Sequence, residues 1–143
     1  RLALARAADV SSIDPDLSEF KARGGKLLIY HGWNDPGPSP YNSINYYTSV
    51  QNTLGGDQSD WLRMFMMPGM GHCRGGVGPD QADFLDAIDN WREGGIAPDR
   101  IEATRIRNGK ADMTRPLCPY PQVAVWNGKG SPDASENHVC EVQ

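Results

Sequence analysis

The sequence has no long hydrophobic run and no excess of positive charge, and these two absences exclude whole classes of function. Its longest apolar stretches, such as residues 26–30, have the length of a β-strand, whereas a membrane-spanning helix needs about 20 apolar residues. Lysine and arginine number 14 against 18 aspartates and glutamates, which gives a net charge of −4. Nucleic-acid backbones attract proteins with a basic surface, so we expect neither a nucleic acid nor a membrane as a partner.

The length of 143 residues predicts one domain, which we divide into three parts. Residues 1–25 form a polar lead-in segment that ends in a short helical turn before a pair of glycines. Within it, residues 1–8 show no legible secretory leader, because Arg6 interrupts the apolar core that a leader needs. Residues 26–107 hold the regular strands and helices, and residues 108–143 form a tail rich in proline and glycine that we expect to be irregular.

Cysteine is scarce, and its number is odd. Cys118 and Cys140 lie 22 residues apart in the tail, a segment of the kind that a disulfide holds in place. Cys73 is then left over. It fits either a small buried thiol or a bridge to a cysteine that this chain does not contain.

The remaining chain predicts alternating strands and helices. Residues 26–30 and 61–67 are apolar runs typical of buried strands, and helical spacing of apolar residues predicts helices over residues 40–54 and 84–93. Two buried strands joined by a helix favour a parallel sheet covered by helices, which is the α/β class. Two parallel strands cannot bury their faces and edges alone, so we expect further strands from elsewhere. Residues 101–106 are a candidate for one short strand.

Two side chains with catalytic potential follow the predicted strands at equal distances. Asp35 lies five residues after Tyr30, and His72 lies five residues after Met67. The carboxyl ends of parallel strands meet at one edge of a sheet, where ligands bind, so both side chains should lie at that edge. An acid followed by a histidine is also the order of the last two members of a serine-hydrolase triad. The acid would hold one ring nitrogen, and the other nitrogen would take the proton of the serine.

Each of these residues also has an ordinary explanation. Asp35 precedes Pro36 and fits a turn, and His72 fits a loop histidine bonded to the backbone. Their matched positions and their order favour the catalytic hypothesis. The serine itself is missing, because no serine lies in a Gly-x-Ser-x-Gly motif and Ser39, next to Pro40, is better explained as a helix cap.

Weaker signals surround the first strand. His31 and Gly32 faintly resemble the oxyanion loop of lipases, but a structural histidine at the end of a strand is the simpler interpretation. Trp33, close to Asp35, is a candidate substrate-binding residue, although loop packing explains it as well. Three scattered histidines and one spare cysteine do not supply the four ligands of a structural zinc site, so we expect no metal in this chain.

Five segments resemble the tannase and feruloyl esterase family, to which mono(hydroxyethyl) terephthalate hydrolases also belong. The similarity extends from about Asp14 to Cys140 and matches the C-terminal third of a typical member. The segments are DPDLSEF at residues 14–20, RGGKLLIYHG at 23–32, DPGPSP at 35–40, PGMGHC at 68–73 and TRPLCPYP at 114–121.

The resemblance implies the C-terminal portion of an α/β-hydrolase fold, in which residues 26–107 belong to the core. Members are serine esterases that cleave esters of aromatic acids of the feruloyl, galloyl or terephthaloyl type. By matching motif, Asp35 is the triad acid and His72 the triad base. The nucleophile, the oxyanion loop, the lid and the calcium site of the lid have no counterpart here, so we expect no cofactor in this chain.

The resemblance also implies a role for each cysteine. Cys73 matches a cysteine that pairs with one directly before the nucleophilic serine, and Cys118 and Cys140 match a disulfide of the C-terminal tail. The expected partners are therefore the upstream part of the same enzyme, which carries the serine, and a small aromatic ester. Disulfides indicate a secreted or periplasmic setting.

Two alternatives remain at this point. The chain could be a non-catalytic interaction module derived from the same fold, or part of another α/β-hydrolase such as a carboxypeptidase-like enzyme. On the leading hypothesis, the chain alone is inactive, because it carries the acid and the base without the serine.

Overall fold

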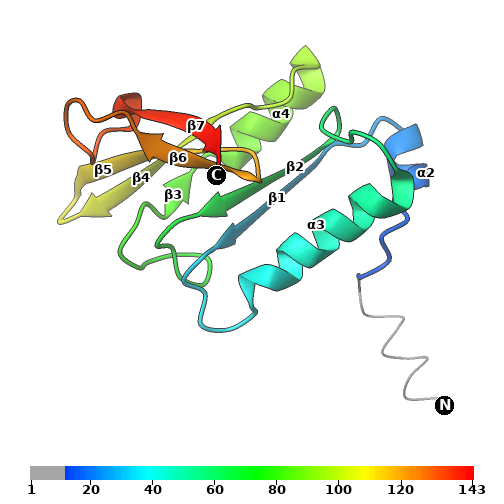
Figure 1. The fold of residues 1–143 in the computed structure, drawn as a ribbon, viewed down its shortest axis with the longest axis horizontal. Helices are drawn as coiled ribbons and strands as arrows, with labels where there is room; N and C mark the ends of the chain where they lie inside the picture. Colours follow the sequence, from blue (N-terminus) through cyan, green and yellow to red (C-terminus); the bar gives the residue numbers. More distant parts are fainter. Residues whose placement is uncertain (1–11) are drawn as a thin grey trace.

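The computed structural model describes residues 12–143. The expectation that residues 1–8 hold no leader therefore lies outside the described residues. A parallel pair of strands occupies the middle of the fold, with helix α3 along one side and a group of antiparallel strands on the other (Figure 1). None of the helices in residues 12–143 is long and apolar enough to cross a membrane.

The two predicted strands form a parallel pair, as expected. The first is only partly buried, and its Tyr30 is 46% exposed, so the expectation of a buried strand holds for the second strand alone. Strand β1 (Leu27–Gly32) and strand β2 (Leu62–Met67) run in register, so that Leu27 faces Leu62 and Gly32 faces Met67. The two strands therefore end at the same level. This register carries the loops that follow them to one edge of the pair.

Strand β2 is buried on both faces, because alternate side chains point to opposite sides of a strand. Leu62, Met64 and Met66 pack with the apolar face of α3, whereas Phe65 and Met67 pack with the antiparallel strands. The fold thus has two apolar clusters that meet at β2. This double burial explains why the sequence of β2 is a continuous apolar run.

The helices begin and end close to the predicted positions. Helix α2 (Ser18–Ala22) is the short turn of the lead-in, and α3 (Pro40–Leu54) follows Ser39, whose side chain makes no capping hydrogen bond. Helix α4 (Phe84–Gly94) begins after Asp83, which accepts a hydrogen bond from the N–H of Asp86. Gly95 ends α4 in the left-handed conformation, with φ at 73°.

The expectation of an irregular tail is wrong, because the region after residue 107 contains strands β5 (Lys110–Leu117), β6 (Gln122–Trp126) and β7 (His138–Val142). A short 3₁₀ helix (Ser135–Asn137) precedes β7.

Strand β5 forms a hairpin with β4 (Ile101–Arg107), the strand before it. Residues 101–106 do form a strand, but it pairs antiparallel with β5 and with β3 (Gln81–Ala82) in a second sheet. Asn108 and Gly109 connect β4 to β5, and both have positive φ. An Asn-Gly pair of this kind is a strong hairpin signal that the sequence interpretation overlooked.

Covalent and polar contacts fasten the last part of the chain, which holds the 3₁₀ helix and β7, to the ends of the β4–β5 hairpin. A disulfide joins Cys118 to Cys140, the pairing that the sequence predicts. The Arg100 guanidinium donates to the backbone carbonyls of Ser135, at 2.7 Å, and His138, at 3.3 Å. The side chain of His138 is buried and hydrogen-bonds to Arg115.

Acidification should weaken this attachment, because burial and the nearby charges of Arg115 and Arg100 lower the pKa of His138 below 6.5. The unfolded chain therefore binds more protons than the folded chain just below that pH, and stability falls as the pH falls. We expect the free energy of unfolding, measured by urea denaturation, to decrease between about pH 8 and about pH 5.

The matched control for this prediction is His138→Gln, which keeps a polar side chain and removes the titration. Its stability should depend less on pH than that of the unsubstituted chain over the same range. Equal pH dependence in the two chains would contradict the assignment to His138.

Candidate active site

The loops after β1 and β2 are joined to each other by their backbones. The N–H of Trp33 donates to the carbonyl of Met67 at 3.0 Å, and the N–H of Asn34 donates to the carbonyl of Met70 at 2.9 Å. Main-chain hydrogen bonds alone therefore hold the first loop against the second.

Gly32, the last residue of β1, allows this close approach. A Cβ atom at this position would lie 2.4 Å from the carbonyl oxygen of Met70 and 2.5 Å from that of Gly71. Both contacts are with backbone atoms, which cannot move aside as a flexible side chain can. Only glycine lets the second loop pack directly on the end of β1.

Asp35 and His72 meet at the edge formed by these loops, as their equal offsets predict. Nδ1 of His72 lies 2.7 Å from Oδ2 of Asp35, and the N–H of Gly37 donates to Oδ1 of Asp35 at 2.8 Å. The Asp35 side chain is 4% exposed, whereas that of His72 is 59% exposed. The carboxylate is thus buried behind an imidazole that is open to solvent.

The surroundings of Asp35 keep it ionised. Burial by itself raises the pKa of the carboxyl, but hydrogen bonds from His72 and Gly37, together with the positive charge that His72 and His31 can carry, outweigh it and lower the pKa. A carboxylate in this position can hold the Nδ1 proton of His72. The Nε2 atom of His72 has no hydrogen-bond partner within residues 12–143, so it is free to accept a proton from another group.

A second histidine approaches the same carboxylate from the interior. Nε2 of His31 lies 3.2 Å from Oδ2 of Asp35, and Nδ1 of His31 lies 2.8 Å from Oγ of Ser43 on α3. The sequence interpretation treated His31 as a structural residue and considered Ser43 only as a nucleophile, which its surroundings excluded. The four-residue spacing from His31 to Asp35 was the available signal, but such spacing fixes side-chain proximity in a helix and not at the end of a strand.

Asp35 and His72 face a cleft of about 200 Å³, whose other lining residues are Tyr30, His31, Gly32, Pro38, Met70 and Cys73. Trp33 does not line this cleft. Its ring packs edge-on against Tyr41, with 5.9 Å between the ring centroids. The suggested role of Trp33 in substrate binding remains a prediction.

The loop that carries His72 is held in shape by its own backbone. The N–H of Gly71 donates to the carbonyl of Gly75 at 2.8 Å, and the N–H of Val77 donates to that of Gly69 at 2.9 Å. Cys73 lies in this loop with φ at 61°, exposed and with a free thiol. An exposed thiol does not fit the small buried thiol that was one interpretation of Cys73.

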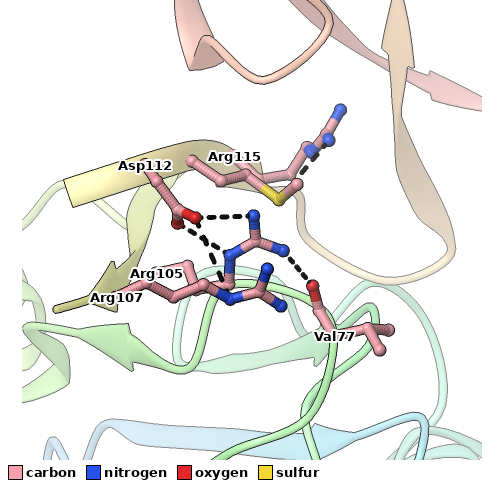
Figure 2. Close-up of polar contacts among 6 residues, drawn as sticks. Val77, Arg105, Arg107, Asp112 and Arg115 are labelled. Carbon is pink, nitrogen blue, oxygen red and sulfur yellow. Dashed lines mark hydrogen bonds and ion pairs between the residues drawn. The ribbon is translucent and has the colours of Figure 1, made fainter.

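An arginine of the second sheet anchors the same loop. Arg105 in β4 donates to both carboxylate oxygens of Asp112 in β5, at 2.8 and 3.0 Å, and also donates to the carbonyl of Val77 (Figure 2). The hydrogen bonds to Asp112 raise the pKa of Arg105 and lower the pKa of Asp112. The ion pair therefore stays charged and connects the β4–β5 hairpin to the loop of His72.

Removing this anchor should loosen the loop. In Arg105→Met, we expect the backbone amide of Val77 to exchange with solvent faster, by on the order of fivefold, because its loop loses a contact to a charged donor. Hydrogen exchange followed by NMR measures this rate.

The control is Arg107→Met, because the Arg107 guanidinium lies 3.9 Å from Asp112 and its side chain is 55% exposed. This variant should leave the exchange rate of Val77 unchanged. Equal exchange rates in Arg105→Met and the unsubstituted chain would contradict the anchoring role.

Known proteins share this arrangement of elements. The family model described as tannase and feruloyl esterase matches residues 3–141. The chain is 41% identical to mono(2-hydroxyethyl) terephthalate hydrolase of Piscinibacter sakaiensis, over 87% of this chain and 21% of that protein. It is 38% identical to an uncharacterized esterase of Xanthomonas campestris pv. campestris, over 94% of this chain and 29% of that protein.

Solved structures agree with the sequence comparisons. The crystal structure of feruloyl esterase B from Aspergillus oryzae matches with a TM-score of 0.86 at 30% identity, covering 97% of this chain and 32% of that one. The chain thus spans less than a third of the length of each of these proteins.

Proposed function

The chain belongs to the tannase and feruloyl esterase family, and from this premise we propose that it supplies the acid and the base of a serine-dependent carboxylic ester hydrolase. The observation that carries the proposal is the 2.7 Å contact between Oδ2 of the buried Asp35 and Nδ1 of the exposed His72. This contact lies beyond the carboxyl ends of two parallel strands, where open α/β sheets bind their ligands.

In the proposed reaction, Asp35 accepts a hydrogen bond from Nδ1–H of His72 and leaves Nε2 unprotonated. Nε2 takes the proton of a serine hydroxyl as the serine oxygen bonds to the ester carbonyl carbon. The bond between that carbon and the alcohol oxygen then breaks, and the alcohol leaves with the proton from Nε2. Water repeats the sequence on the acyl-enzyme and releases the acid. The Asp35 carboxylate stabilises the imidazolium that forms in each half.

The serine belongs to a part of the enzyme outside this chain. The position of Cys73, exposed and next to His72, supports a disulfide to a cysteine that directly precedes that serine. Such a disulfide would hold the nucleophile and the base together. It also fits a secreted or periplasmic enzyme, since disulfides persist in oxidising compartments.

The proposed substrates are esters of aromatic acids of the feruloyl, galloyl or terephthaloyl type. The support comes from relatives that are named mono(2-hydroxyethyl) terephthalate hydrolase, tannase and feruloyl esterase B. Trp33 is the exposed aromatic residue nearest in sequence to Asp35, and we keep it as a candidate contact for the aromatic ring.

The isolated chain should hydrolyse neither methyl ferulate nor an aliphatic ester of similar size, because it lacks the nucleophile. Spectrophotometric assays at high protein concentration test this, with the His72→Ala chain as the matched control for contaminating esterases. If the unsubstituted chain hydrolyses an ester and the His72→Ala chain does not, the assignment of the serine to another part of the enzyme is wrong.

In the complete enzyme, Asp35→Asn should lower kcat for methyl ferulate by about 10⁴-fold, because the amide no longer selects the required tautomer of His72. Asp89→Asn is the matched control, because Asp89 is an exposed residue of α4 away from the cleft, and it should keep full activity. A kcat for Asp35→Asn close to that of the unsubstituted enzyme would refute the triad assignment. Equal kcat/KM values for methyl ferulate and the aliphatic ester would refute the proposal that the substrates are esters of aromatic acids.

A further inference from the structure

We propose that Ser43 and His31 act as positioning residues that hold the Asp35 carboxylate in place for His72. Together these four residues form what we name the polar chain, in the order Ser43, His31, Asp35, His72. The inference rests on the proposed function in one respect only, that Asp35 is the group which holds His72.

The contacts of Asp35 support this role. Oδ1 accepts the N–H of Gly37 at 2.8 Å, and Oδ2 faces two imidazoles, His72 at 2.7 Å and His31 at 3.2 Å. His72 is exposed and can turn, whereas His31 is 12% exposed and lies in the interior. The fixed position of Oδ2 therefore depends on the buried side of the carboxylate, which is the side of His31.

The charges around His31 favour one tautomer. The negative charge of Oδ2 of Asp35, 3.2 Å from Nε2, favours a proton on Nε2 even though Nε2 makes no hydrogen bond to that oxygen. With the proton on Nε2, the ring accepts the Ser43 hydroxyl proton at Nδ1, across 2.8 Å. Ser43 belongs to α3, so the helix sets the orientation of the His31 ring.

The contact between His31 and Asp35 is an electrostatic contact and not a hydrogen bond. Nε2 of His31 is buried and has no hydrogen-bond partner among the described residues, and Oδ2 of Asp35 lies 3.2 Å away, within ion-pair distance. Because a buried N–H without a partner is costly, the attraction of the carboxylate to Nε2 is the contribution that we assign to His31. It favours the position from which Oδ2 accepts Nδ1–H of His72.

The consequence can be measured on His72. A neutral histidine carries its proton on either ring nitrogen, and the hydrogen bond to Asp35 selects Nδ1–H. If His31 stops holding the carboxylate, this selection weakens, and the Nε2–H tautomer of His72 appears. Nitrogen-15 NMR spectra of the complete enzyme, labelled at its histidines, distinguish the two tautomers at about pH 8, and the His72→Gln variant identifies the signals of His72.

Two substitutions of similar polarity distinguish a positioning effect of His31 from a general loss of structure. In His31→Gln the amide nitrogen reaches the position of Nε2, beside Oδ2 of Asp35, whereas the shorter amide of His31→Asn reaches only the position of Nδ1. We expect His72 to keep the Nδ1–H tautomer in His31→Gln and to lose a large part of it in His31→Asn. Ser43→Ala should cause a smaller loss, and His138→Gln should cause none.

The proposal is overturned if His31→Asn leaves the tautomer of His72 unchanged, or if His31→Gln and His31→Asn lose it equally. An unsubstituted enzyme whose His72 lacks the Nδ1–H tautomer would overturn both this proposal and the role of Asp35. The NMR measurement of the His72 tautomer requires no ester. A complete enzyme that hydrolyses no aromatic ester would therefore refute the proposed substrate class and leave the positioning role intact.

Discussion

The register of one pair of parallel strands determines the geometry of the candidate site. Because Gly32 and Met67 face each other at the ends of β1 and β2, the loops that follow begin at the same level. Backbone hydrogen bonds then join the loops, and the carboxylate of Asp35 reaches Nδ1 of His72. A shift of one residue in this pairing would turn the side chains of one strand to the other face and separate the two groups.

The parts of this arrangement that follow from local patterns could be predicted from the sequence. Apolar runs, helical spacing, a Ser-Pro start and glycine ends place the strands and helices of the first half to within a few residues. The approach of Asp35 to His72 could be predicted as well, because parallel strands bring equal offsets to one edge. The order of Asp35 and His72 in the chain suggested the last two members of a triad, and the family resemblance led to the same proposal.

The remaining features depend on contacts between distant segments, which leave no periodic signal. Arg105 reaches the carbonyl of Val77, 28 residues earlier, and Arg100 reaches that of Ser135, 35 residues later. The hairpin at Asn108 did have a local signal, yet the proline and glycine content of the tail obscured it. His31 is an intermediate case, because its distance from Asp35 depends on how the chain turns after β1.

The close approach at Gly32 means that the main chain places Asp35 and His72, while other side chains form the surface around them. The end of β1 packs against carbonyl oxygens of the second loop, so the position of Asp35 relative to His72 depends mainly on the main chain. The side chain of Trp33 in the loop and that of Tyr41 at the start of α3 pack against each other and take no part in that contact. Evolution can therefore exchange them and alter what docks at the surface, while the imidazole stays where it is.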